Sequence, residues 1–270
     1  MLSYSPFHSN ALVWKERLKM NSFIPWIGGK KLLRKEILSR FPKEQPSRYI
    51  EVFGGAGWVL FAKEHNSKQL EVYNDLNGDL VNLYRCVKYH AQEVQRECEF
   101  LLNSREIFIN YKEQMNINGL TDIQRAARFL YLIKVSFGAD GKTYGTNAKN
   151  ISYSVNMLHE ISKRLNRVVI ENKSYDNLIK VYDRNNALFY LDPPYYKTEK
   201  YYGNLFDEED HIKLRDILRD IKGRFILSYN DCAFIRELYS DFYIEEVERN
   251  NNLVKDGDSR YKELIIRNYK

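Results

Sequence analysis

Cysteine is scarce in this chain, and its placement excludes several kinds of site. The 270 residues contain three cysteines, Cys86, Cys98 and Cys232, and no two of them form a Cys-x-x-Cys pair. None has a metal-ligand spacing to the five histidines. We therefore expect neither a metal site nor a disulfide framework. Unpaired thiols are typical of the reducing cytoplasm, where we expect the protein to work.

Long apolar runs are also missing. No stretch approaches the roughly 18 apolar residues that a membrane helix needs, so we expect no membrane partner. Residues 1–20 include Lys15, Arg17 and Lys19 but lack the apolar segment of a signal peptide. We interpret them as an extension before the fold.

A strong excess of one charge is absent too. The chain has 42 Lys and Arg against 36 Asp and Glu, which gives a net charge of +6. Such an excess is compatible with a polyanionic partner if the basic side chains gather on one face, although many other enzymes share it. The 21 tyrosines suit core packing or, alternatively, stacking on nucleic acid bases.

What the chain does contain is an alternation of short apolar runs with helical patterns, typical of a mostly parallel sheet covered by helices. A helix is predicted from Leu76 to about Asn103, and another begins at Thr121, where Thr121 and Gln124 have capping-box spacing. The helical stretch after the second strand is longer than a simple crossover between parallel strands. We therefore predict an α/β core from 1–79 and 166–270, with a helical subdomain inserted over 80–165. The predicted strands are 49–53, 70–73, 168–170, 187–191, 225–228, 242–244 and 263–266.

One motif, Asp192-Pro193-Pro194-Tyr195, directly follows the apolar strand 187–191. Ligand crevices open at the carboxyl ends of such strands, and two successive prolines make the turn stiff. The Asp192 carboxylate and the Pro193 carbonyl could accept hydrogen bonds from an aromatic amine and localise its lone pair. Tyr195 could stack on the ring. The structural alternative is a proline-rich turn that only closes a strand.

A glycine-rich turn, 54–57, ends the first strand and opens a helical stretch. Glycine permits positive φ and close backbone approach to a ligand. Asp75 ends the next strand, where a carboxylate can accept hydrogen bonds from a ribose diol. Together they indicate a nucleoside cofactor, although a glycine turn alone occurs in many folds.

Upstream, Gly28-Gly29-Lys30 precedes a helical stretch at 32–38. It lacks the spacing and terminal hydroxyl of a P-loop, which disfavours nucleotide hydrolysis. Lys30 could approach the cofactor's carboxylate or, alternatively, be a solvated lysine at a helix start.

The order of these motifs resembles the Dam-like, alpha-class DNA adenine methyltransferases over about residues 22–268. The resemblance implies a Rossmann-like methyltransferase sheet with helices on both faces and a mainly helical target-recognition insertion. It implies transfer of a methyl group from S-adenosyl-L-methionine to the N6 amine of a flipped-out adenine in double-stranded DNA. The implied catalytic residues are Asp192, Pro193, Pro194 and Tyr195, and the implied cofactor contacts are Trp26, Lys30, Phe53, Gly55, Asp75, Asp176 and Asp192. Phe206 falls where the family has an aromatic residue of the target site.

Basic side chains of the insertion and its loops are candidates for phosphate contacts, which set affinity and register. The candidates are Arg125, Lys142, Tyr144, Lys149, Lys197 and Lys200, with Arg128, Lys134, Lys163 and Arg164 as further ones. Each of these charges is alternatively a solvated surface group. The stretch 137–147 lacks the Phe-Asn-Val-Pro run of relatives that recognise GATC, so the target sequence stays open.

Two other functions are compatible with the motifs: methylation of RNA or of another planar amine or amide, and a catalytically silent nucleic-acid-binding module. The motif order and the helical insertion disfavour the first. The intact Asp192, Tyr195, Asp75 and Lys30 disfavour the second. We expect a monomer, and leave open a cognate restriction endonuclease and a preference for hemimethylated DNA.

Overall fold

The computed structural model describes residues 20–146, 151–198, 206–250 and 260–270. Its centre is a seven-stranded sheet in the order β3-β2-β1-β4-β5-β7-β6. The first five strands are parallel, whereas β7 runs antiparallel to both β5 and β6. This is a mixed α/β fold, and the order of β1 to β5 is that of doubly wound folds. The strands are β1 (Arg48–Glu51), β2 (Leu70–Asn74), β3 (Val168–Glu171), β4 (Ala187–Leu191), β5 (Arg224–Asn230), β6 (Tyr243–Asn250) and β7 (Arg260–Arg267).

Two clusters of buried side chains lie on the two faces of the sheet. Because side chains alternate along a strand, Tyr49 and Ile50 of β1 belong to different clusters. The first cluster includes residues of α2 (Arg34–Ser39), α3 (Trp58–Ala62), α4 (Gly78–Cys98) and α7 (Ser152–Leu165). The second includes residues of α8 (Tyr175–Tyr182), α9 (Glu208–Arg219) and α10 (Ala233–Leu238).

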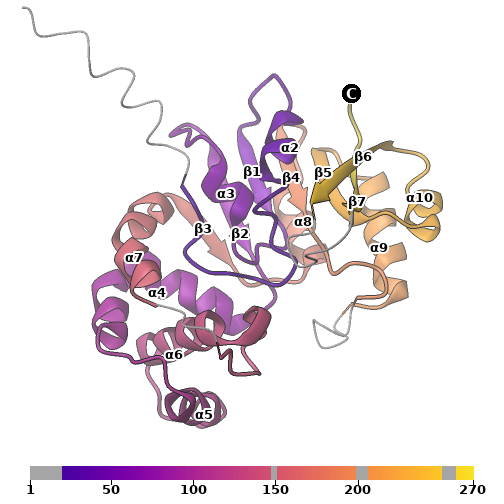
Figure 1. Cartoon of the computed structure of the whole chain (residues 1–270). Helices are drawn as coiled ribbons and strands as arrows, with labels where there is room; N and C mark the ends of the chain where they lie inside the picture. Colours follow the sequence, from indigo (N-terminus) through magenta and orange to yellow (C-terminus); the bar gives the residue numbers. More distant parts are fainter. Residues whose placement is uncertain (1–19, 147–150, 199–205, 251–259) are drawn as a thin grey trace, which may run out of the picture.

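The helices between β2 and β3 gather beyond one end of the sheet (Figure 1). They are α4, α5 (Arg105–Gln114), α6 (Asp122–Val135), the short 3₁₀ turn η1 (Phe137–Ala139) and α7. The predicted capping box opens α6: the Thr121 side chain accepts from the Gln124 amide, and the Gln124 side chain accepts from the Thr121 amide. Asn77 caps α4 by accepting from the Leu80 amide. No helix in the described ranges is both long and apolar enough to cross a bilayer.

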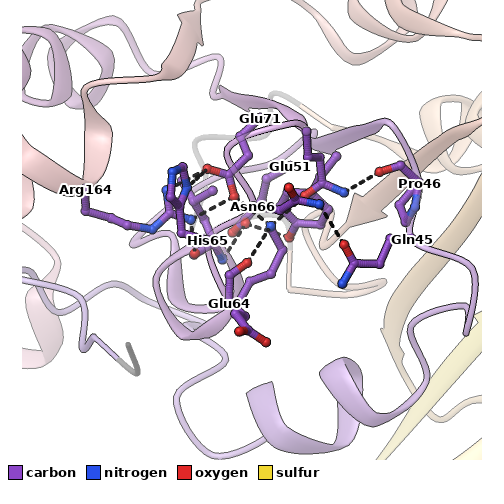
Figure 2. Close-up of polar contacts among 12 residues, drawn as sticks. Gln45, Pro46, Glu51, Glu64, His65, Asn66, Glu71 and Arg164 are labelled. Carbon is purple, nitrogen blue, oxygen red and sulfur yellow. Dashed lines mark hydrogen bonds and ion pairs between the residues drawn. The ribbon is translucent and has the colours of Figure 1, made fainter. Parts of the chain in front are cut away.

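Arg164, near the end of α7, anchors these helices to the sheet (Figure 2). Its guanidinium donates to both carboxylate oxygens of Glu71 on β2, at 2.6 and 2.9 Å, and to the Leu60 carbonyl of α3. Lys63 also pairs with Glu71, at 2.7 Å. Burial raises the pKa of Glu71, but Arg164 and Lys63 outweigh burial, so the pKa lies below its ordinary value. The prediction of Arg164 as a DNA contact is therefore wrong, because its side chain is 8% exposed and bonded inside the protein.

Each predicted strand is present, and residues 187–191 form β4 with the predicted bounds. The predicted 263–266 strand is longer, because β7 pairs with β6 along its whole length. The helix predicted over 76–103 ends earlier, at Cys98, and contains a non-helical residue at His90.

Candidate active site

A cleft of about 1030 Å³ lies along the carboxyl ends of β1, β2 and β4. Its walls include the glycine turn after β1, Asp75 after β2, and Asp192 and Pro194 after β4. Phe129 of α6 and Lys142 line it from the helices between β2 and β3. The structure thus brings three separately predicted motifs to one cavity. All seven predicted cofactor contacts line it: Trp26, Lys30, Phe53, Gly55, Asp75, Asp176 and Asp192.

The glycine turn is closely packed. Gly55 has a φ of +48°, and a Cβ there would lie 2.8 Å from Cδ1 of Trp26. A Cβ on Gly54 would lie 2.3 Å from the ring of Tyr73. A side chain at either position would force its neighbour to move, so the backbone itself forms this wall of the cleft.

Asp75 holds the glycine turn from the neighbouring strand. Its Oδ2 accepts from the Gly55 amide at 2.8 Å, and its Oδ1 accepts from the Asn77 amide at 2.8 Å. Burial raises the pKa of Asp75, and these amide hydrogen bonds partly oppose that rise. Each carboxylate oxygen keeps further acceptor capacity, which a ribose hydroxyl could use.

One end of the cleft is aromatic. Phe53 stacks on Tyr175 with ring centroids 5.9 Å apart, and Phe206 packs edge-on against Phe53. Phe206, predicted as an aromatic residue of the target site, lines the cleft beside these two rings, and its role stays a prediction. Asp176 lies at the same end and pairs with Lys213 at 2.8 Å. The hydrogen bond from Lys213 lowers the pKa of Asp176 to about 2.

Asp192 also lines the cleft, and its two carboxylate oxygens differ in their partners. Oδ1 accepts from the Lys30 ammonium and from the Ser228 hydroxyl, both at 2.8 Å. Among the described residues, no donor is bound to Oδ2, which leaves this oxygen for a ligand. Burial raises the pKa of Asp192, and Lys30 and Ser228 oppose that rise.

Lys30 is 4% exposed and lies inside the protein rather than at a solvated helix start. Besides Asp192, it binds the Gly28 carbonyl at 2.8 Å. The sequence suggested a cofactor carboxylate as its partner. In the structure its ammonium group pairs with Asp192.

Tyr195, which was predicted to stack on the target ring, makes its contacts with other residues of the protein. Its hydroxyl donates to Oε2 of Glu263 at 2.5 Å, and its ring centroid lies 4.5 Å from the Lys30 ammonium. Among the described residues that line the cleft, Asp192 and Pro194 are present, whereas Pro193 and Tyr195 are not. The stacking role of Tyr195 and the acceptor role of Pro193 therefore stay predictions.

Sequence reasoning missed three polar residues next to the cleft. Ser228 and Glu263 reach the Asp192 turn from β5 and β7. Glu51, the last residue of β1, accepts from the Tyr49 hydroxyl and the Leu60 amide. Burial raises the pKa of Glu51 to about 8. An acidic residue at the end of a buried strand was a visible signal for Glu51, whereas nothing in the local sequence marks Glu263.

Comparison with known proteins identifies the family. Residues 26–253 match the D12 class N6 adenine-specific DNA methyltransferases. The chain belongs to this family. Its reaction is therefore methyl transfer from S-adenosylmethionine to the N6 amine of adenine in DNA.

Individual relatives of this methyltransferase match over nearly their whole length. Type II methyltransferase M1.LlaDCHI of Lactococcus lactis subsp. cremoris is 29% identical, over 96% of this chain and 99% of the relative. Type II methyltransferase M.CviBI of a Paramecium bursaria Chlorella virus is 27% identical, over 93% and 100%. The DNA adenine methylase of Haemophilus influenzae is 25% identical, over 93% and 94%.

The candidate DNA contacts of the methyltransferase have different surroundings. Lys142 is exposed and lines the cleft, and its carbonyl accepts from Lys112. Tyr144 donates to Asn103 at 2.8 Å. Lys197 is exposed and has a positive φ of 67°.

Arg125 is instead part of the packing between helices. Its guanidinium pairs with Asp79 of α4 at 3.3 Å and donates to the Met115 carbonyl. These internal partners disfavour its predicted role in binding phosphate. Two further candidates, Lys149 and Lys200, lie outside the described residues.

Proposed function

We propose that this methyltransferase flips an adenine out of duplex DNA and holds its N6 amine against Oδ2 of Asp192. The observation that carries this proposal is the geometry of Asp192: Lys30 and Ser228 occupy Oδ1, and the same cleft contains the glycine turn. The carboxylate cannot rotate freely, so its other oxygen is presented in a fixed direction. Acceptors that are held in place stabilise the transition state more than mobile ones, because they need not reorganise during the reaction.

The residues around the cleft fit S-adenosylmethionine. The aromatic end, with Phe53, Tyr175 and Phe206, suits the adenine ring, and Asp176 suits its amino group. Asp75 suits the ribose diol. Gly54 and Gly55 line the cleft, and Trp26 packs where a Cβ on Gly55 would lie, so this turn presents backbone rather than a side chain to a ligand. When bound, S-adenosylmethionine supplies an electrophilic methyl group on a sulfonium centre.

Asp192 activates the amine by accepting its hydrogen bond. The lone pair of an exocyclic amine is delocalised into the ring, and acceptors at the amine favour a pyramidal nitrogen with a localised pair. The nitrogen then forms a bond to the methyl carbon while the carbon–sulfur bond breaks and its electron pair stays on sulfur. The methylated nitrogen afterwards loses one proton to solvent. Positioning and electrostatics are sufficient for this step.

The helices between β2 and β3 are proposed as the target-recognition unit. They form the wall of the cleft opposite the sheet, and the exposed Lys142 lies at its edge. Phosphate contacts from this wall would hold the duplex while the base enters the cleft. We also propose that the chain acts as a monomer in the cytoplasm. The names of two relatives, both Type II methyltransferases, support a restriction-modification role beside a cognate endonuclease.

Sequencing DNA from a methylation-free host that expresses the chain tests the proposal, because it reports the base, its position and the motif together. Purified Asp192→Ala should lose transfer to an oligonucleotide carrying that motif while it still binds cofactor. Asp241→Ala removes an exposed carboxylate outside the cleft and should transfer at the parental rate. Equal transfer by Asp192→Ala would remove Asp192 from the mechanism. Faster transfer to a ribose oligonucleotide would favour an RNA substrate.

A further inference from the structure

Two side chains of α9, Asp210 and Lys213, reach the aromatic end of the cleft and have no role in the proposed reaction so far. They are three positions apart, so they lie on the same face of the helix. That face meets the first turn of α8, which begins with Tyr175 and Asp176. All four residues line the cleft. Helix α9 therefore contacts the part of the cleft that is proposed to hold the adenine of the cofactor.

Lys213 holds the carboxylate of Asp176. Its ammonium group donates to Oδ2 at 2.8 Å, while Oδ1 accepts from the Asn177 amide at 2.9 Å. The hydrogen bond from Lys213 is the main cause that lowers the pKa of Asp176 to about 2, so the group is ionised and can only accept hydrogen bonds. Each oxygen has one donor and keeps the capacity for a second. The carboxylate is therefore held in one orientation and can still accept from an amine.

Asp210 holds the ring of Tyr175. Its Oδ1 accepts from the Tyr175 hydroxyl at 3.0 Å, and its Oδ2 accepts from the Asp207 amide at 3.2 Å. The second bond belongs to a capping box, because the Asp207 side chain also accepts from the Asp210 amide. The capping box fixes the start of α9 and, with it, the Asp210 carboxylate. Tyr175 packs against Phe53 and Phe206, with ring centroids 5.9 and 5.6 Å away, so Asp210 fixes one ring of the aromatic wall.

We propose that Lys213 is a positioning residue for the cofactor, which aims the Asp176 carboxylate at the amine on position 6 of the adenine. Asp210 supports this arrangement by holding Tyr175 in the wall beside it. An acceptor that is already oriented binds more tightly, because its freedom of rotation is not lost on binding. The site thereby selects a purine that carries an amine at position 6. This inference rests on the proposed function, in which the aromatic end takes the adenine, but it does not depend on the role of Asp192.

Calorimetry with two ligands tests this selection without any methyl transfer. One ligand is S-adenosylhomocysteine, and the other is its analogue with hydrogen in place of the 6-amino group. The parental protein should bind the first at least about tenfold more tightly, because the analogue leaves the carboxylate without its donor. Asp176→Ala should bring this ratio of affinities close to one.

Lys213→Met tests the positioning, because it removes the ammonium group and keeps most of the side chain. The ratio of affinities should fall about threefold or more, since the Asp176 carboxylate is free to rotate. Lys213→Arg keeps a cationic donor and should restore most of the parental ratio. Tyr175→Phe removes only the hydroxyl that Asp210 holds. It should weaken binding of both ligands to a similar extent and leave the ratio in place, because position 6 is still recognised.

Lys262→Met is the matched control. Lys262 also pairs with a carboxylate, that of Glu246 at 2.7 Å, and its side chain is 55% exposed against 54% for Lys213. It is not among the described residues that line the cleft, so its loss should leave both affinities unchanged. A parental ratio near one, or an undiminished ratio in Lys213→Met, would overturn the inference. If the ratios behave as expected but Asp192→Ala still transfers methyl groups, the proposed function fails and the inference stands.

Discussion

Gly55 sets how closely a ligand can approach the end of β1. Its φ is +48°, its amide donates to Asp75, and the ring of Trp26 covers the space that a Cβ would take. Positive φ alone costs a non-glycine residue about 1–2 kcal/mol. A Cβ at this position would also collide with Trp26, so Trp26, which lines the cleft, would have to move. Conformation and contact therefore both require glycine here.

Gly55→Ala should weaken binding of S-adenosylmethionine at least tenfold, because Trp26 or the turn must move. Isothermal calorimetry measures this directly. Gly138→Ala is the control, since Gly138 also has a positive φ, of +59°, but its Cβ would meet nothing within 4 Å. That variant should show the stability cost and unchanged cofactor affinity. Equal affinity losses in both would mean that strain, and not the contact with Trp26, is responsible.

At the scale of single residues, the sequence predicted several residues of the cleft but not the charged partners of basic side chains. Asp192, Asp75 and Gly55 were predictable because strand ends meet at one edge of a sheet. The charged partners were not, because they lie far apart along the chain. Lys30 pairs with Asp192, Arg125 with Asp79 and Arg164 with Glu71. A basic residue whose partner is distant in sequence looks like a free surface charge.

At the scale of elements, α7 depends on one buried ion pair. Arg164 reaches Glu71 on β2 (Figure 2), and the side chains of the two residues are 8% and 1% exposed. Because the pKa of Glu71 is lowered in the folded state, its contribution to stability is full above the ordinary glutamate pKa. It is lost as the pH falls through the lowered value. The anchor between the helices and the sheet should therefore weaken in acid.

Arg164→Met should lower the free energy of unfolding by about 3–5 kcal/mol, because it leaves Glu71 buried with fewer partners. Urea denaturation at neutral pH measures the loss. Lys163→Met removes the adjacent, exposed cation, which pairs only at the surface with Glu160, and should cost less than about 1 kcal/mol. A similar small loss for Arg164→Met would show that Lys63 alone compensates Glu71.

Elements differed in how well the sequence predicted them. The strand at 187–191 is apolar throughout and buried throughout, so pattern and structure agree. The Thr121 capping box was also predictable, because its two residues are only three positions apart in the sequence. The role of β7 could not be foreseen, because its register against β5 and β6 decides that Glu263 faces the Asp192 turn. Antiparallel register between strands distant in sequence has no local signal.

At the scale of the whole molecule, the cleft has two walls that come from different parts of the chain. Trp26 precedes the first strand of the sheet, and its ring packs against that of Phe129 of α6, with ring centroids 6.4 Å apart. The exposed Lys142 lies on the wall opposite the glycine turn. In the proposed function only the flipped base enters the cleft, and the duplex outside it would meet this basic side chain on the helical side.

Lys142→Ala should weaken DNA binding and lower the slope of log affinity against log salt by about one, as expected for one lost phosphate contact. Fluorescence anisotropy at several salt concentrations measures both. Lys180→Ala removes the same formal charge from an exposed position of α8 that does not line the cleft and was not a candidate DNA contact. It should leave the slope unchanged. Identical slopes for the two variants would indicate a general effect of net charge.

The placement of β7 between β5 and β6 has a consequence for biosynthesis. While residues 260–267 are still inside the ribosome, β5 lacks the neighbour that completes its hydrogen bonding, and its edge can pair with another nascent chain. Glu263 arrives with this late strand, as does the contact that holds Tyr195. An unfinished polypeptide without β7 would therefore expose a sheet edge that is prone to aggregation.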